Sequence, residues 1–248
     1  MNPAEFANIA RLESGFWWYR GMRQILLGLL DAMFTGDVPK RVLDAGCGTG
    51  YFAGFLQQQR NWPVFAVDLR REGLTHARDL NVLRLAQGDI AALPFSDATF
   101  DCVFSLDVIV HLPKGGEQTA MRELVRVLLP KGMLILRVAA LGALRSRHSE
   151  FTCERQRFTR GRLTQLSEAH GIRVLRCTYA NMLLLPVAFV KFRIWEPLMR
   201  KRPASSVVPV SRWLDRLLYL PLALESLCLR TGMNFPVGQS LILVGIKE

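Results

Sequence analysis

Residues 42–50 read VLDAGCGTG, a short apolar segment that runs directly into three glycines spaced two residues apart. Glycine lets the backbone take positive φ values and approach a ligand without a Cβ atom in the way. A buried strand that ends in such a turn is typical of an open α/β sheet, in which ligands bind at the carboxyl ends of the strands. Residues 42–50 therefore predict the first strand of the sheet and a ligand-binding turn.

The pattern around this turn alternates between short apolar segments and amphipathic segments. Strands are predicted over 42–44, 64–68, 82–87, 100–105, 133–139, 172–177 and 240–246, and helices over 4–14, 19–34, 51–60, 71–79, 116–128 and 160–170. Such alternation predicts a parallel sheet with helices on both faces. The long gap before the last strand holds two apolar and basic helical segments, 182–202 and 211–231, and Pro221 is expected to kink or break the second.

Two classes of cofactor fit a glycine turn of this kind. A dinucleotide fold requires GxGxxG or GxGxxA, and GTGYFA from Gly48 matches that string. The turn begins at Gly46, however, and from there the sixth position is Tyr51, whose ring would obstruct the close contact between helix and strand. The dinucleotide interpretation is therefore the weaker one.

Several strings further along the chain favour the other class. Asp44, Gly46, Gly48 and Gly50 form a DxGxGxG turn, and it is followed by GDI at 88–90, LPFSDATFDCV at 93–103, SLDVIVHL at 105–112 and RELVRVLLPKG at 122–132. Over about residues 38–180 the sequence resembles the class I S-adenosylmethionine-dependent methyltransferases, in particular bacterial members of the type 11 kind. The resemblance implies a Rossmann-like α/β sandwich with a seven-stranded, mostly parallel sheet whose last strand is antiparallel. Lys131 stands where the family pattern usually has glycine.

This resemblance also implies roles for individual residues. Asp44 and the turn of Gly46, Cys47, Gly48 and Gly50 would hold the methionine part of the cofactor. Asp68, at the end of the second strand, would bind the ribose, and Leu69 would lie beside the adenine. The remaining contacts implied by the family are Asp89 and Ile90 at the adenine, and Ser105 and Leu106 at the methionine and the methyl group.

An aromatic and basic cluster precedes the first strand. Glu13, the WWYR segment at 17–20 and Arg23 resemble an N-terminal element of some of these bacterial methyltransferases. As a flap over the cofactor, Trp18 and Arg23 would contribute an aromatic face for a sulfonium and a guanidinium for a carboxylate. The alternative interpretation is an aromatic staple that packs the N-terminal helix on the core.

Two histidines are candidates for a general base. His111 follows the fourth strand at the carboxyl edge of the sheet, and imidazole titrates near neutral pH. His148 lies in the loop after the fifth strand and is the second candidate. A base contributes only where the acceptor starts out protonated, because the sulfonium already activates the methyl group. Packing near the cofactor is the alternative role for His111, and Cys47 is predicted to be a small turn residue and no nucleophile.

The charge of the chain is distributed unevenly. The net charge is +11, yet residues 1–136 sum to zero, so all of the excess lies in residues 137–248. A neutral part followed by a basic part suggests a core and an anion-facing portion. Either a helical cap over the sheet or a surface at a membrane interface would explain the basic and apolar helical segments, whereas nucleic acid is disfavoured because no RNA-binding module is visible.

Composition excludes several other classes. No apolar run reaches the ~18 residues that span a bilayer, and the best candidate, 182–190, is closed by Lys191 and Arg193. The acidic start is unlike a signal peptide. Five scattered cysteines without a CxxC spacing indicate neither disulfides nor a metal site and suit the cytoplasm.

These observations predict a helical flap over 1–36, a cofactor-binding core over 37–181, a helical insert over 182–236 and the last strand of the core over 237–248. The expected function is methyl transfer from S-adenosylmethionine, which leaves S-adenosylhomocysteine, to an oxygen of a small, anionic or lipid-linked acceptor, with carbon or nitrogen as the less favoured target. Two alternatives stay open: a non-catalytic protein that binds the cofactor and acts through its basic insert, and an RNA methyltransferase. The predicted location is the cytoplasm, with peripheral contact to the inner membrane through residues 182–231. The oligomeric state is left open.

Overall fold

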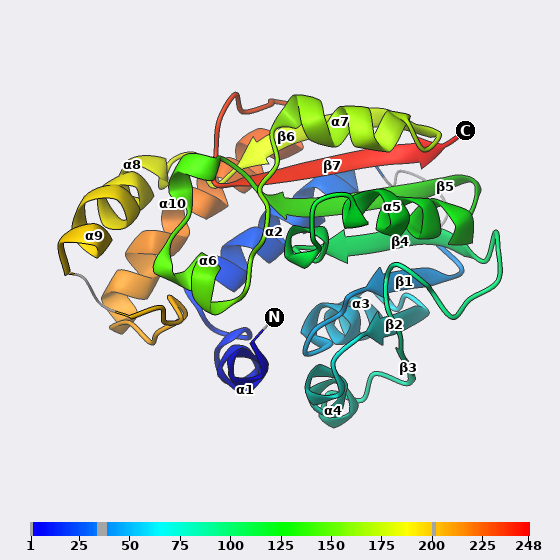
Figure 1. The fold of residues 1–248 in the computed structure, drawn as a ribbon, viewed down its shortest axis with the longest axis horizontal. Coiled ribbons are helices and arrows are strands. Elements are labelled where there is room, and N and C mark those ends of the chain that lie inside the picture. The colour runs from blue at the N-terminus through cyan, green and yellow to red at the C-terminus, as the bar shows by residue number, and fades with distance from the viewer. Residues whose placement is uncertain (1, 34–38, 200–201) are drawn as a thin grey trace.

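A seven-stranded sheet forms the centre of the molecule (Figure 1). The computed structural model describes residues 2–33, 39–199 and 202–248. The strands follow the spatial order β3-β2-β1-β4-β5-β7-β6. Their bounds are β1 Val42–Ala45, β2 Val64–Asp68, β3 Arg84–Gln87, β4 Phe100–Leu106, β5 Leu128–Ala139, β6 Ile172–Ala180 and β7 Ser240–Lys247.

The direction of the strands follows the expectation from the sequence. β3, β2, β1, β4 and β5 are parallel neighbours, whereas β7 runs antiparallel to both β5 and β6, between which it lies. The predicted mostly parallel sheet with an antiparallel last strand is confirmed. β5 begins five residues earlier than predicted, and its pairing with β4 shifts register between Phe100 and Cys102.

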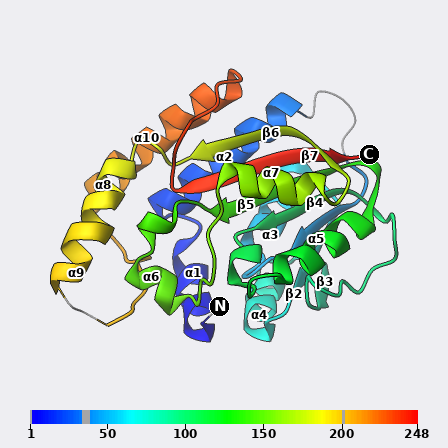
Figure 2. The same cartoon turned by 45° about the horizontal axis from the view of Figure 1, so that its top comes forward.

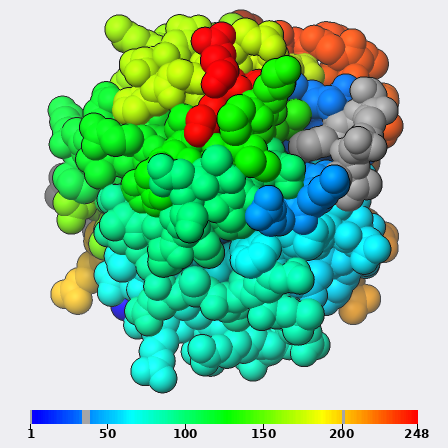
Figure 3. Space-filling view, turned by 90° about the vertical axis from the view of Figure 1, so that its right-hand side faces the viewer, coloured from blue at the N-terminus to red at the C-terminus, as the bar shows by residue number. Residues whose placement is uncertain are grey.

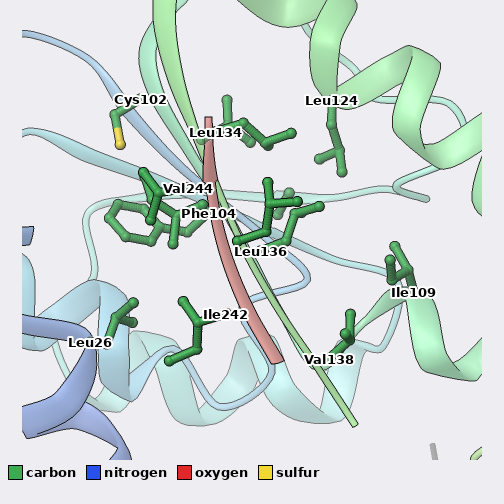
Figure 4. Packing of buried hydrophobic residues seen from close by; sticks show 14 of the residues in the cluster. Leu26, Cys102, Phe104, Ile109, Leu124, Leu134, Leu136, Val138, Ile242 and Val244 are labelled. Atoms are coloured by element: carbon green, nitrogen blue, oxygen red, sulfur yellow. The ribbon is translucent and has the colours of Figure 1, made fainter. Parts of the chain in front are cut away.

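Helices cover both faces of the sheet, as the close view of the core shows (Figure 4). Strand residues such as Phe104, Leu136 and Ile242 are almost fully buried and supply the centre of the core. Leu26 packs on one side and Leu124 on the other. The helices involved are α2 Trp17–Met33, α3 Tyr51–Arg60, α4 Arg71–Asp79, α5 Gly116–Val127 and α7 Arg160–Glu168.

The N-terminal part adds one further helix, α1 Pro3–Leu12. Asn2 caps it, because its side chain accepts a hydrogen bond from the Ala4 N–H at 3.1 Å. α2 begins two residues earlier than predicted, so Trp17 and Trp18 are helical. The predicted end of that helix, Phe34, lies outside the described residues.

The segment before β7 is helical, as expected. It contains α8 Leu185–Phe189, the π-helical η3 Val190–Trp195, α9 Glu196–Met199 and α10 Arg212–Arg230. Pro221 does not break α10, which continues through it. The helix tolerates the missing N–H because α2 holds it on both sides of the proline: Asp215 pairs with Arg20 at 2.5 Å, and the Ser226 hydroxyl donates to the Gln24 carbonyl at 3.0 Å.

Three short elements that the sequence pattern did not predict lie in the connections after β4 and β5. They are η1 Ile109–His111, η2 Gly142–Leu144 and α6 Arg147–Phe151. The right-hand side of Figure 1 is built mainly from the segments between β1 and β5, with the red end of β7 and yellow-green and orange segments at its top (Figure 3). Among the described residues, no helix combines the length and apolar character that crossing a membrane requires.

Candidate active site

A cavity of about 770 Å³ lies along the carboxyl ends of the parallel strands. That size is in the range that holds a small molecule or a cofactor. The ends of β1, β2 and the segment after β3 line one part of it, through Asp44, Asp68 and Asp89. Residues that follow β4 and β5, together with α6 and η3, line the other part. Because the strand order is β3-β2-β1-β4-β5, these two parts lie side by side along the edge of the sheet.

The glycine turn forms the floor of the first part. The N–H groups of Gly46 and Cys47 both donate to the Val67 carbonyl, at 2.7 and 2.9 Å, which fixes the turn against β2. Gly46 has φ +88°, and a Cβ atom there would lie 2.4 Å from a methyl of Val108, so only glycine fits. At Gly48, φ is +58° and a Cβ atom would meet no atom within 4 Å, so this part of the turn faces open space where a ligand can approach.

Asp68 stands at the end of β2 with its carboxylate directed at this turn. One oxygen accepts the Gly48 N–H at 2.8 Å and the other accepts the Arg70 N–H at 2.7 Å. Burial raises the pKa of Asp68, while these two backbone donors oppose the shift. An ionised carboxylate has about four acceptor positions, so two remain for hydroxyl groups of a ligand. The neighbouring Leu69 lines the cavity and is 56% exposed, which makes it an apolar surface suited to a flat base.

Asp89 and Ile90 complete this part of the cavity. Asp89 accepts the Ala91 N–H through one oxygen at 2.9 Å, which leaves the second oxygen available. Asp44 is buried at the end of β1, and burial together with the nearby Asp68 raises its pKa to about 7, although Arg137 opposes the shift. A cationic ammonium group would stabilise the ionised form of Asp44. These features together fit S-adenosylmethionine: the glycine turn, the free acceptor positions of Asp68, the apolar surface of Leu69 and the buried carboxyl of Asp44.

The N-terminal segment closes the cavity over the glycine turn. The Thr49 hydroxyl donates to the Glu13 carboxylate at 2.6 Å, so the end of α1 is tied to the turn itself. Burial raises the pKa of Glu13 to about 7, against the effects of the Thr49 hydrogen bond and of Arg23. Phe6 of α1 is buried over Gly73 of α4. Glu13 was identified as part of the N-terminal element, but its contact with Thr49 could not be predicted because the two residues are 36 positions apart.

The aromatic cluster is divided between the core and the cavity wall. Phe16 is buried, as a packing residue would be, whereas Trp17, Trp18 and Tyr19 line the cavity. The Arg137 guanidinium lies over the Trp18 ring, 5.3 Å from its centroid. Burial raises the pKa of Tyr19, so its hydroxyl keeps its proton.

Asp107 and Arg137 form a pair that could not be assigned from the sequence. Asp107 directly follows β4, Arg137 lies near the end of the adjacent strand β5, and their charged groups lie 2.7 Å apart at the cavity wall. Asp107 has φ +60°, an uncommon conformation outside glycine that places its carboxylate against Arg137. The only signal in the sequence was that each residue stands at a strand end.

The two candidate histidines both line the cavity, but their hydrogen bonds indicate different tautomers of the neutral imidazole ring. The Nδ1 atom of His148 accepts the Ser206 N–H at 3.1 Å, so a neutral His148 carries its proton on Nε2 and can only donate there. Burial and the charge of Lys191 lower the pKa of His148 to about 4, which keeps it neutral. The Nδ1 atom of His111 lies 3.4 Å from the Cys153 carbonyl, which requires an N–H at that position and leaves Nε2 free to accept a proton. Burial lowers the pKa of His111 as well.

Most of the predicted cofactor residues meet at this cavity, including Cys47, Leu106, Trp18 and Arg23. Burial raises the pKa of the Cys47 thiol well above its ordinary value, which suits its predicted role as a turn residue. Gly50 and Ser105 do not line the cavity. Gly50 allows close packing instead, because a Cβ atom there would lie 2.4 Å from Ala77 of α4. The Ser105 side chain is buried, and its hydroxyl has no hydrogen-bond partner among the described residues.

The second part of the cavity is rich in basic side chains. Arg157 pairs with Glu154 at 2.6 Å, and Arg137 is paired as described above. Arg155 and Lys191 also line the cavity, and neither makes an ion pair with any residue that the structure describes. Two cations therefore remain for an anionic group of a ligand. Among the described residues there is no group of three or more side chains that could hold a metal ion.

Comparison with known proteins agrees with this site. Residues 42–132 match a family model described as a methyltransferase domain. A malonyl-[acyl-carrier protein] O-methyltransferase of Erwinia pyrifoliae is 42% identical over 109 residues, which are 42% of this chain and 39% of that protein. The corresponding protein of Herminiimonas arsenicoxydans is 39% identical over 136 residues, 53% of this chain and 49% of that protein. The chain thus matches less than half the length of these curated relatives.

Solved structures share the fold over nearly the whole chain. The methyltransferase in the Haloferax volcanii complex with the Trm112 activator superposes with a TM-score of 0.64 at 19% identity, covering 98% of this chain and 97% of that one. At such low identity the likeness concerns the fold alone. The family match adds the glycine turn and the motifs that follow it. Residues 42–132 are therefore similar to methyltransferase domains, and the fold of nearly the whole chain is that of solved methyltransferases.

Proposed function

We propose that this protein transfers the methyl group of S-adenosylmethionine to a carboxylate oxygen of an amphiphilic acid. The observation that carries the proposal is the make-up of the single cavity described above. One part has the glycine turn and Asp68, and the adjoining part has the unpaired cations Arg155 and Lys191. Two cations in the same cavity as the glycine turn suit an acceptor whose reacting group is an anion.

The names of the curated relatives support the same chemistry. Those proteins are called malonyl-[acyl-carrier protein] O-methyltransferases, so their named acceptor ends in a carboxylate and is attached to a carrier. For this chain we infer the class of acceptor only: an acidic acyl group on a carrier or on another amphiphile. The apolar character of much of the cavity wall, including Trp17, Phe192 and Val207, suits the non-reacting part of such a molecule.

The bound cofactor supplies a methyl group already activated by the positive sulfonium. In the transfer, the sulfur–carbon bond breaks as a carboxylate oxygen forms a new bond to the same carbon, so the products are a methyl ester and the neutral thioether. No proton is released, because the carboxylate is already ionised. Arg155 and Lys191 would hold and orient the acceptor, and the N-terminal cover with Trp18 would exclude water.

The test uses radiolabelled S-adenosylmethionine with a panel of acceptors that contains malonyl-[acyl-carrier protein], free long-chain dicarboxylic acids and matching long-chain alcohols. We expect labelled product from the acids, a gain of one methylene in mass, and release of the label by mild alkali, because esters hydrolyse where ethers and N-methyl groups do not. Alkali-stable label would contradict a carboxylate acceptor. Cofactor binding without turnover of any acceptor would favour a non-catalytic protein that binds the cofactor. Salt-sensitive binding and methylation of RNA would favour an RNA methyltransferase.

A further inference from the structure

The exposed apolar side chains of this protein are concentrated in one segment. Of the nineteen large apolar residues that are exposed among the described residues, sixteen lie between positions 182 and 236. Scattered exposed apolar residues need no explanation, but a concentration in one region marks a surface that meets something. We call the exposed apolar and basic residues of α8, η3, α9 and α10 the insert surface.

α10 carries a continuous apolar stripe. Its members are spaced by four and three residues and so share one face of the helix. Each is between 53 and 67% exposed. The opposite face, with Leu222 and Leu229, is buried against α2. The stripe consists of Trp213, Leu217, Leu220, Leu224 and Leu227.

A second stripe runs along α8, η3 and α9. Val187, Val190, Ile194 and Leu198 are each more than half exposed and follow the same spacing. Trp195 adds an exposed aromatic ring beside them. In both ribbon views these helices and α10 gather at the same end of the molecule (Figures 1 and 2). The elements that carry the two stripes therefore lie at the same end of the protein.

The charges of this segment are sorted between the surface and the interior. Residues 182–236 contain eight basic and three acidic residues. All three acids are directed inward: Glu196 accepts the Arg147 N–H, Asp215 pairs with Arg20, and Glu225 accepts the N–H groups of residues 181 and 183. Six basic residues make no ion pair with any residue that the structure describes: Lys191, Arg193, Arg202, Arg212, Arg216 and Arg230. The insert surface is thus both apolar and cationic.

A second, smaller cavity lies beside α10. It measures about 340 Å³ and lies between α2, α3 and α10. Among the described residues, one carboxylate, that of Asp31, and four arginines line it: Arg20, Arg23, Arg60 and Arg230. Asp31 is already paired with Arg60 at 2.6 Å, so the cavity keeps an excess of positive charge. It adjoins the flank of α10 that carries Arg212, Arg216 and Arg230, because the spacing of these residues places them on one side of the helix.

We propose that the insert surface binds the face of an anionic lipid bilayer, with the stripes of α8–α10 in the interfacial layer and the arginines at the headgroups. Apolar side chains beside unpaired cations are what such a layer recognises. A second copy of the chain is a poorer partner, because it would bring the same unpaired cations together. Lys191 and Phe192 of η3 also line the large cavity, so its opening would face the bilayer, from which an amphiphilic acid could enter. That last step rests on the function proposed above, whereas binding to the bilayer does not.

The experiment measures binding to vesicles in the absence of acceptor and cofactor, so its result is independent of methyl transfer. Vesicles of phosphatidylcholine alone are compared with vesicles that contain phosphatidylglycerol, at low and high salt. We expect binding to the anionic vesicles that weakens in salt but persists. Leu220→Glu should weaken it at least tenfold, and Arg216→Ala about fivefold, the contribution of one cation near such a surface.

Matched variants control for general effects of charge. Leu83→Glu changes an apolar residue that is 78% exposed on the far side of the sheet, and Arg78→Ala removes an exposed cation from α4. Both should bind as the unchanged protein does. Equal binding by Leu220→Glu and the unchanged protein would overturn the proposal, since attraction by net charge alone would then explain it. The absence of binding to anionic vesicles would also overturn the proposal. If the protein instead formed a dimer that Leu220→Glu dissociates, a second copy of the chain would be the partner of this surface.

Discussion

Asp68 is the side chain on which we expect recognition of the cofactor to depend most directly. Asp68→Asn keeps the size of the group but removes its charge and replaces one acceptor oxygen with a donor that faces the Gly48 N–H or the Arg70 N–H. We expect affinity for S-adenosylmethionine to fall at least tenfold, measured by titration calorimetry. Asp97→Asn, on a turn where the side chain is 78% exposed, is the control and should bind normally. Equal affinities of the two variants would remove Asp68 from the site.

His111 and His148 test which atom receives the methyl group. A carboxylate acceptor has no proton to lose, so His111→Gln should lower kcat by less than about tenfold on the acid acceptor. With a hydroxyl acceptor, loss of the base would cost about 10²–10⁴-fold. His148→Gln should not differ in pH profile from the unchanged protein, because His148 stays neutral above about pH 4. A loss of more than a hundredfold in His111→Gln alone would indicate a protonated acceptor.

The contact between α2 and α10 is the element-level feature that holds the insert on the core. A Cβ atom at Gly21 would lie 2.3 Å from the Leu222 side chain, so the two helices approach closely only because glycine stands there. Gly21→Ala should lower the free energy of unfolding by ~1–3 kcal/mol through overpacking. Gly161→Ala in α7 has no atom within 4 Å of the added methyl and should be neutral or stabilising by up to ~1 kcal/mol. Urea unfolding of both variants compares them, and equal effects would contradict a tight contact.

At the level of helices and strands, the sequence predicted the features that depend on local sequence pattern. α3 and α4 have the predicted bounds, because clear start and stop signals in the sequence flank both helices. The prediction that Pro221 breaks α10 was wrong, because the compensating contacts come from α2, some 200 positions away in the sequence. Lys131 was recognised as a departure from the family pattern, and the structure gives it φ +62°, the conformation that explains why glycine is usual there. The glycine turn and its aspartates were identified from motifs, whereas the pairs Glu13–Thr49 and Asp107–Arg137 depend on tertiary contact alone.

For the whole molecule, the buried carboxyls predict how stability depends on pH. The folded protein raises the pKa of Glu13 and of Asp44 to about 7, from ordinary values of 4.5 and 3.8. Between about pH 4 and 7 the folded state therefore holds protons that the unfolded state releases, so stability falls as the pH rises through this range and levels off above it. Each of the two carboxyls lowers the free energy of unfolding by up to about 3–4 kcal/mol as the pH rises through this range.

Denaturant unfolding of the cofactor-free protein at pH 5 and pH 8 measures this change. Glu13→Gln keeps an acceptor for the Thr49 hydroxyl and removes the charge, so it should reduce the difference between the two pH values. Glu72→Gln, at an exposed position of α4, should leave the difference unchanged. A larger difference in Glu13→Gln than in the unchanged protein would contradict the assignment of a raised pKa to Glu13.

The position of β7 has a consequence for the order in which the chain can fold. Among the described strands, β6 pairs with β7 alone, and β7 begins 60 residues after β6 ends. During synthesis, β6 emerges with no strand to pair with until the whole helical insert has followed it. The pairings of β7 with β5 and β6 are contacts of high sequence separation, and such contacts slow folding. The apolar stripes of the insert are thus made before the sheet beneath them is complete, so this region is where a folding intermediate would be most exposed to aggregation.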